Sequence, residues 1–468
     1  MFGSAFFVWI MFITNLVLFV IAYKVFDGDI ISPSVVTLGL FLISFACFVY
    51  NIGYWEVVFT FRAYCLFTIS FVVMIVVECF IKNHRFLIGR GIYKSVNEES
   101  TLSDVEDVSI PYLYIEKSWN VVIVSFVIMF GLYYIYKIYK VGSSYGVNNL
   151  LYAIGATKEE ESFDLISRLI FNIIRFVSYE YALILCQNVF VFKKRVIDNI
   201  SSIIVLTMAL LCMFFSGQRS VLISYVFGII VIACVVIYDK KKTEKNVQMK
   251  KIIKRLVFMG GLLIAFFYLS RNIVKGRTTT TCFMEYLTFY FGSTTALMGR
   301  IVEQPDICHT EFVGYFGEKT FNGFYKSLYK WKIISQLPCD RAWIKMGGST
   351  PSYRAGNEFT FFCAPYIDFG FVGTIIFMGI FYLAFSVIYY KLILNKKLTI
   401  RRYSILIIYS YLFTLISMSF YQDTIRSFSR PTTLVYFLFI SGFTHIFLKK
   451  ELILNNTSNC NTRGDFRN

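Results

Sequence analysis

The 468-residue chain is 57% hydrophobic and only 16% charged. Soluble domains carry about a quarter charged residues, so this chain has too little polar surface to cover a water-soluble globule of its size. The net charge of +17 does not indicate a nucleic-acid partner, because the basic residues form short clusters between apolar runs. We therefore expect an all-α polytopic membrane protein whose surroundings are the lipid bilayer.

The apolar runs follow one another along nearly the whole chain. A transmembrane helix needs about 20 mostly apolar residues. Such runs lie at 6–23, 32–52, 61–81, 119–138, 168–191, 200–215, 221–238, 255–270, 361–390, 404–420 and 432–448. They predict about eleven helices, between ten and twelve, in a single membrane domain over residues 1–450. The first run lacks a basic leader and a cleavage site, so we expect it to remain as a span.

The basic clusters predict the orientation of these spans. They lie at 82–94, 193–195, 240–255, 391–402 and 449–450. If the spans alternate, all five fall on one side, which the positive-inside rule assigns to the cytoplasm. Lys137, Lys140 and Lys158 fall on the other side. The N-terminus is then outside, and the C-terminal tail at 451–468 is cytoplasmic.

This topology leaves one long polar segment, residues 271–360, outside the cytoplasm. Loops of this length between packed elements usually have a function. Within it, residues 282–300 are apolar but interrupted by Glu285 and Gly292. We expect a re-entrant or interfacial helix there; a full span would invert every side downstream.

Arginines recur on the predicted outer side, where the positive-inside bias makes them unexpected. They are Arg219, Arg271, Arg277, Arg300, Arg341, Arg354, Arg426 and Arg430. The planar guanidinium binds two phosphate oxygens at once and keeps its charge. The alternatives are snorkelling at the membrane interface or pairing with nearby carboxylates. Arg219 starts a span, where the free N–H groups and the positive end of the helix dipole also favour an anion.

The segment 347–373 carries the densest group of polar side chains beside a span. Arg354 is a candidate for holding a phosphate. Tyr353 and Asn357 are candidates for contacts with sugar hydroxyls, and Glu358 for accepting a proton.

Asp368 lies one or two turns into the apolar run that follows. An intramembrane carboxylate is costly, which makes it a candidate binding residue. The alternative is that it is a helix-packing partner for a nearby Tyr or Ser.

Four motifs carry a resemblance to a known family. They are NEFTFFCAPYIDFGFVG (357–373) with the Arg354 to Gly370 spacing R-x15-G, SGQRS (216–220), YFGSTTALMGR (290–300) and FGEKTFNGFYKSL (316–328). Together they resemble the outer loops of bacterial O-antigen and capsule repeat-unit polymerases of the Wzy type. The resemblance covers residues 205–390. One spacing departs from the family pattern R-x10-G: Gly228 follows Arg219 two residues too early.

The resemblance implies a helical bundle similar to that of GT-C glycosyltransferases, acting at the outer face of the bacterial inner membrane. It implies transfer of a growing glycan from undecaprenyl pyrophosphate to an incoming lipid-linked repeat unit, in some systems with a chain-length regulator. The residues placed to stabilise charge on the leaving diphosphate are Arg219, Arg271, Arg277 and Arg354. Glu358 is the first candidate for the base that deprotonates the acceptor, and His309 the second. No cofactor is implied.

Three other functions fit a membrane protein of this kind. A flippase for the same lipid-linked glycan would need charges along the spans, where Glu78, Glu180 and Asp368 are the notable cases. An O-antigen ligase would rely on an outer-loop histidine, but His309 lacks a convincing motif.

The third alternative is a metal-dependent transferase that uses a lipid phosphosugar. It would bind its metal through Asp27 and Asp29, which the predicted topology places inside the cell. Since no cluster of His and Cys residues has metal-ligand spacing, we expect no metal.

Overall fold

The computed structural model describes a helical membrane protein over residues 2–55, 58–83, 110–144, 165–217, 219–243, 283–308, 313–338, 344–345, 355–356 and 358–451. In these residues, eight helices are long and apolar enough to cross a membrane. They are Ser4–Val25, Pro33–Tyr50, Phe61–Asn83, Lys117–Ser143, Ile166–Val191, Val196–Phe215, Ser220–Lys241 and Cys363–Leu394. The chain is therefore an all-α, multi-pass membrane protein.

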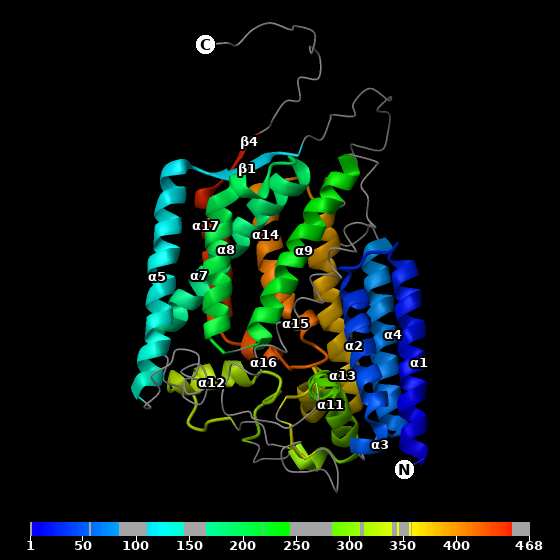
Figure 1. Cartoon of the computed structure of the whole chain (residues 1–468). Helices are drawn as coiled ribbons and strands as arrows, with labels where there is room; N and C mark the ends of the chain where they lie inside the picture. Colours follow the sequence, from blue (N-terminus) through cyan, green and yellow to red (C-terminus); the bar gives the residue numbers. More distant parts are fainter. Residues whose placement is uncertain are drawn as a thin grey trace, which may run out of the picture.

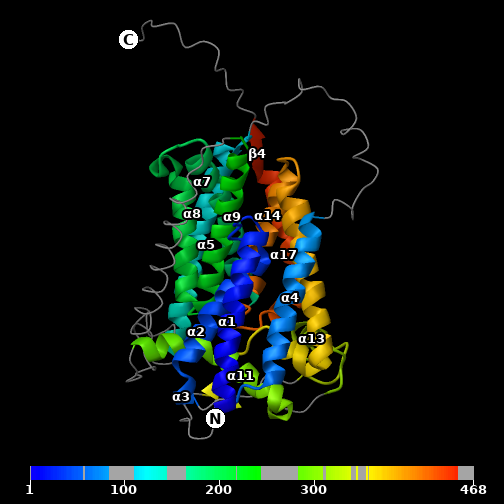
Figure 2. The same ribbon diagram turned by 90° about the vertical axis from the view of Figure 1, so that its right-hand side faces the viewer.

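The helices form two neighbouring groups (Figures 1 and 2). The first contains α1 (Phe2–Val25), α2 (Pro33–Tyr50), α3 (Ile52–Trp55), α4 (Phe61–Asn83), α11 (Phe283–Glu303) and α13 (Cys363–Ser386), which continues as the π-helix η5 (Val387–Leu394). The second contains α5 (Lys117–Ser144), α7 (Leu165–Cys186), α8 (Ile200–Phe215), α9 (Arg219–Thr243), α14 (Ile400–Leu412) and α17 (Thr432–Phe447). Contacts between η5 and α14 join the two groups.

The described parts of all five basic clusters lie at one end of the bundle, here named the basic end (Figure 1). This is the arrangement that simple alternation of the spans predicts. Two short helices, η1 (Gln187–Val191) and η2 (Val196–Asn199), lie here. Strand β1 (Tyr112–Ile115) also pairs antiparallel with β4 (Leu448–Glu451) at this end. The Gln187 amide accepts from Leu113 N and donates to Pro111 O, which fixes β1 to the bundle.

The opposite end, here named the loop end, carries the connections that lie outside the spans (Figure 1). Besides α11 they contain η3 (Pro305–Cys308), α12 (Asn322–Lys330), β2 (Ile344–Lys345), β3 (Ala355–Gly356), α15 (Thr414–Ser417) and α16 (Ile425–Phe428). Strands β2 and β3 pair antiparallel.

Helix α11 occupies the apolar stretch whose role the sequence left open. It is not among the helices apolar enough to span, and it packs across α2 at the loop end (Figure 1). Thr295 and Ser44 share a hydrogen bond. A Cβ on Gly292 would lie 3.0 Å from the backbone nitrogen of Phe48, so a larger residue would push the two helices apart by a few tenths of an ångström. The arrangement disfavours a full span, and the re-entrant or interfacial helix remains the prediction.

Two of the eleven predicted spans differ from the continuous helices of full length that we expected. Run 404–420 is broken, because α14 ends at Leu412 and the short α15 follows. Helix α17 is apolar but has only 16 residues. Run 255–270 lies outside the described residues. The total of eleven remains a prediction.

The bundle also holds more interior charge than the sequence indicated. Arg402 of α14 forms a bidentate ion pair with Asp239 of α9, with two N–O distances of 2.8 Å, and both side chains are almost fully buried. The same guanidinium donates from Nε to the Ile393 carbonyl. The sequence analysis missed this pair because both residues belong to strongly basic segments at helix ends, where charge is expected to be solvated.

Candidate functional site

The structure describes part of the predicted site. The candidates Arg271, Arg277, His309, Tyr353, Arg354 and Asn357 lie outside the described residues. Arg219 is the first residue of α9, and the structure describes its backbone only. Glu358 and Asp368 are described together with their contacts, and both lie at the loop end, as predicted.

Glu358 lies on the short segment that leads into α13, and it is half-buried. Gln422 donates from Nε2 to Glu358 Oε1 at 3.5 Å. The Phe361 N–H donates to the Ser419 carbonyl at 2.8 Å, so the segments before α13 and after α15 lie side by side. The carboxylate is thus fixed beside a neutral amide on a partly open surface, which suits a proton acceptor.

Asp368 accepts three hydrogen bonds from one loop. The donors are Lys319 N at 3.1 Å, Thr320 N at 2.6 Å and the Thr320 hydroxyl at 2.6 Å. Gly370 interrupts α13 two residues later, with φ +67°, a conformation that glycine adopts without strain. These contacts agree with the packing alternative for Asp368, although its partners are a threonine and two backbone amides rather than a Tyr or Ser.

Glu318 makes the same loop compact, and sequence reasoning did not single it out. Its buried carboxylate accepts from Val313 N at 3.0 Å and from Gly314 N at 3.2 Å. The backbone turns at Gly317, which has φ +63°. The motif at 316–321 therefore forms a folded turn that Asp368 and Glu318 hold from two sides.

Arg175 is a buried guanidinium on α7 that sequence reasoning also missed. Only 7% of the residue is exposed, and its Cζ lies 4.9 Å from the ring centre of Tyr411. The guanidinium interacts with the Tyr179 hydroxyl, but its Nε and Nη2 make no hydrogen bond to a residue that the structure describes. The signal was present, since an arginine within an apolar run is a candidate functional residue. Because the run is apolar as a whole, its mean hydropathy does not reveal this single charged residue.

The position of Arg175 follows from the packing of α7 against α9, which run in the same direction (Figure 1). The rings of Tyr179 and Tyr225 lie 5.0 Å apart, and the Tyr225 hydroxyl donates to Ser178 Oγ at 2.8 Å. Arg175 lies one turn before Tyr179, so it is level with the first turn of α9. That turn begins at Arg219 and carries the positive end of the helix dipole.

Two further arginines come from α16 and the residues after it. Phe428 packs on Tyr411 with ring centres 5.0 Å apart, and the charges of Arg175 and Arg430 both act on Tyr411. Arg426 donates from Nη2 to Asn322 Oδ1 of α12 at 2.9 Å. We name Arg175, Arg426 and Arg430 the arginine cluster.

The arginine cluster and Glu358 share the loop end. Gln422, which contacts Glu358, precedes Phe428 by six residues, a length of chain that spans at most about 20 Å. Phe428 therefore lies within about 20 Å of Gln422. A lipid-linked glycan whose phosphates bind at the cluster is long enough to reach the Glu358 carboxylate, which can accept a proton. This arrangement can bind an anion and move a proton.

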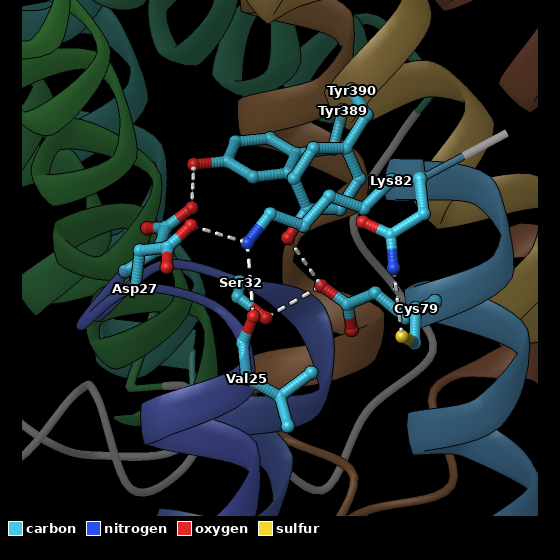
Figure 3. A network of polar contacts seen from close by, with 10 residues as sticks. Val25, Asp27, Ser32, Cys79, Lys82, Tyr389 and Tyr390 are labelled. Atoms are coloured by element: carbon cyan, nitrogen blue, oxygen red, sulfur yellow. Dashed lines mark hydrogen bonds and ion pairs between the residues drawn. The ribbon is translucent and has the colours of Figure 1, made fainter. Parts of the chain in front are cut away.

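Asp27 and Asp29, the metal-binding alternative, are engaged by other groups at the basic end (Figure 3). Asp27 pairs with Lys82 Nζ at 2.7 Å, and this hydrogen bond lowers its pKa. Asp29 accepts from the Tyr389 hydroxyl at 2.7 Å and from Ile31 N at 3.1 Å. Burial raises the pKa of Asp29. In the described part of the chain, no three His, Cys, Asp or Glu side chains gather within metal-binding reach.

Glu78 of α4 (Phe61–Asn83) completes this network. Its carboxylate accepts from Ser34 N at 2.7 Å, from the Tyr390 hydroxyl at 2.9 Å and from the Ser32 hydroxyl. Ser32 makes no side-chain cap of its own on α2. Because a helix N-terminus favours negative charge, Glu78 acts as the cap of α2, which explains a carboxylate inside a span.

The two aspartates predict opposite responses to truncation. Asp27→Ala should leave stability and activity nearly unchanged, because the side chain of Asp27 is 84% exposed and its ion pair is solvated. Asp29→Ala should lower the free energy of unfolding by about 1–3 kcal/mol, since it leaves the buried Tyr389 hydroxyl without its acceptor. Thermal unfolding in detergent and a glycan assay test both variants. Equal loss of activity in both variants, without loss of stability, would instead support a metal site.

Comparison with protein-family models, curated proteins and solved structures gives no match to this chain. The function must therefore be argued from the side chains at the loop end and from the motifs in the sequence.

Proposed function

We propose that this protein is a glycosyltransferase that polymerises lipid-linked oligosaccharide repeat units into O-antigen or capsular polysaccharide. The observation that carries the proposal is the arginine cluster, above all the buried guanidinium of Arg175. Its Nε and Nη2 have no hydrogen-bond acceptor among the described residues. A diphosphate would supply the charge and the acceptor oxygens that this group needs. The motifs that resemble repeat-unit polymerases lie at the same end of the bundle.

The distribution of charge supports an outer location for this chemistry. By the positive-inside rule the basic end faces the cytoplasm, so the loop end faces outward from the inner membrane. Both Glu358 and the arginine cluster then lie on the outer side. Undecaprenyl pyrophosphate-linked units are available there after they have crossed the membrane.

The reaction requires one bond to form and one to break at the anomeric carbon of the growing chain. The acceptor hydroxyl of the incoming unit attacks this carbon, and the bond to the diphosphate oxygen breaks. Glu358 takes the proton of the attacking hydroxyl. The arginine forks, including Arg354, stabilise the charge that develops on the departing undecaprenyl pyrophosphate.

The described contacts favour this function over the alternatives. A flippase needs charged side chains along a path through the spans. The interior carboxylates here instead accept hydrogen bonds from groups on other elements; they are Glu78, Glu180, Asp239 and Asp368. Thr444 donates to Glu180, and Arg402 donates to Asp239. The metal-dependent transferase requires Asp27 and Asp29 at the active side, but both lie among the groups of the basic end (Figure 3).

The glycan profile of a deletion strain tests the proposed function. A polymerase defect should leave lipid A cores that carry a single repeat unit, and the plasmid-borne gene should restore long chains. Unmodified cores would instead indicate a ligase or a flippase and would overturn the proposal.

Arg175→Met should separate activity from stability. Because removing a donor to developing charge typically costs about 10²–10³ in rate, polymer yield should fall by about that factor. Thermal stability should be unchanged or higher, because methionine relieves the burial of a guanidinium. The cation–π contact that is lost contributes about 0.5–2 kcal/mol. Polymer length on gels and thermal unfolding of the purified protein provide the two measurements.

The matched control is Arg401→Gln, an exposed arginine at the basic end that should retain full activity. If Arg175→Met destabilised the protein and kept its specific activity, Arg175 would be a packing residue. The proposed anion site would then contain no buried arginine.

A further inference from the structure

Helix α12 exposes an apolar face at the loop end. Phe324, Leu328 and Trp331 follow the spacing i, i+4 and i+7, which places them on one side of the helix. Phe324 is 40% exposed and Trp331 54% exposed. The other side of α12 packs on α16, where a Cβ on Gly323 would lie only 1.9 Å from the Arg426 carbonyl oxygen. The apolar face therefore points away from α16.

The C-terminal cap of α12 extends this face. Lys332 adopts φ +59°, its N–H donates to the Tyr329 carbonyl, and the Ile333 N–H donates to the Leu328 carbonyl, both at 2.9 Å. This pair of hydrogen bonds is the Schellman motif, in which the residue after the left-handed position contacts the last turn of the helix. Ile333, which is 65% exposed, is thereby brought to the side of Leu328.

The height of α12 in the molecule indicates what covers this face. It lies at the level where α5 ends (Figure 1). The apolar helix of α5 has 27 residues, more than the roughly 20 needed to cross the hydrocarbon. Its last turns, with the exposed Tyr136 and Tyr139, therefore reach the interfacial layer, where tyrosine and tryptophan concentrate.

The charge on α12 lies away from this face. Lys326 and Lys330 follow Gly323 at i+3 and i+7 and so lie on the opposite side of the helix, and Lys330 and Lys332 are exposed. An amphipathic helix with aromatic residues on one face and lysines on the other binds the boundary between headgroups and acyl chains, and the lysines attract anionic headgroups.

We propose that α12 and Ile333 lie in the surface of the leaflet at the loop end, with Phe324, Leu328, Trp331 and Ile333 inserted at the boundary between headgroups and acyl chains. The partner is the lipid surface itself. The inference does not depend on the polymerase function, since it uses only the exposure, spacing and charge of this segment.

Fluorescence of Trp331 tests the position of this face. The full-length protein is placed in phosphatidylglycerol vesicles, and the emission of Trp331→Phe is subtracted from that of the wild type. Nitroxide-labelled lipids should quench the Trp331 signal at least about twofold more than aqueous iodide does, most strongly with the label near the headgroups. The corresponding differences for Trp119→Phe, exposed on α5, and Trp55→Phe, buried, give a lipid-contacting and a protected reference.

Iodide quenching that exceeds lipid quenching would show a hydrated face and overturn the proposal. If the quenching of Trp331 changed when excess lipid dilutes the protein in the vesicles, a second copy of the chain would cover the face. That result would also overturn the proposal. Replacing the three lysines by glutamine should lower lipid quenching in phosphatidylglycerol and leave it unchanged in phosphatidylcholine. Equal behaviour of this triple variant in both lipids would refute the role of the lysines. Lys332→Gly alone, which retains the left-handed turn, should keep the Trp331 signal of the wild type.

Discussion

Replacing Arg354 by Ala is expected to abolish long glycan chains, and replacing it by Lys to restore little of the activity. Lysine keeps the positive charge but cannot present two parallel N–H groups to a phosphate. Since a single donor to developing charge typically contributes about 10²–10³ in rate, the alanine variant should lose at least that factor. The measurement is the chain-length profile of glycan made by each variant in a deletion strain.

A matched control for this experiment lies at the basic end. Arg195→Lys changes an exposed arginine that pairs with Asp198, so it should leave the glycan profile unchanged. Full activity of Arg354→Lys would contradict bidentate phosphate binding. Cysteine labelling gives an independent check: if positions 219 and 354 react only from the cytoplasmic side, the proposed site cannot meet its substrate.

Breaking the buried ion pair between Asp239 and Arg402 should have the largest effect on stability. Arg402→Met or Asp239→Ala alone leaves one charge buried without its partner, which typically costs about 3–5 kcal/mol. The arginine variant also removes the Nε hydrogen bond to the Ile393 carbonyl. Since the pair joins α9 to α14, we expect early unfolding of the second helix group. Thermal or denaturant unfolding in detergent measures the loss.

The double variant Asp239→Leu with Arg402→Met separates burial of charge from loss of packing. Because no charge remains unpaired, it should recover much of the stability lost in each single variant. The reference is the exposed pair of Arg195 and Asp198, whose removal should change stability by about 0–1 kcal/mol. If the double variant were as unstable as the sum of the single variants, the pair would contribute through shape and not through compensation of charge.

The variants of Arg354 and Arg175 also distinguish what the sequence could and could not locate. Arg354 belongs to a motif and was selected from its neighbours in the chain. Arg175 has no motif around it; its importance follows from its burial, from the Tyr411 ring at 4.9 Å and from the packing that makes it level with the start of α9. These relations join residues more than 40 positions apart, and no local pattern contains them.

The membrane class and the shared end of the basic clusters were predictable because each depends only on the hydropathy and charge of residues within one segment. A run of about 20 apolar residues must leave water wherever it lies, and a lysine at the end of that run remains solvated whatever the helix contacts. Eight of the eleven predicted runs correspond to helices apolar enough to span. The break after Leu412 escaped prediction because residues 404–420 stay apolar across it, and hydropathy carries no information about backbone direction.

The sequence by itself therefore determined the class of this protein, most of its spans and the shared end of the basic clusters, because solvation of a segment depends on its own residues. Only the tertiary structure decided the roles of the polar residues inside the bundle. Glu78 caps α2, Asp29 accepts from Tyr389, Asp368 holds the loop at Thr320, and Arg175 stacks on Tyr411. The physical reason is that a buried polar group is stabilised by the partner that packing brings to it, and that partner comes from a distant part of the chain.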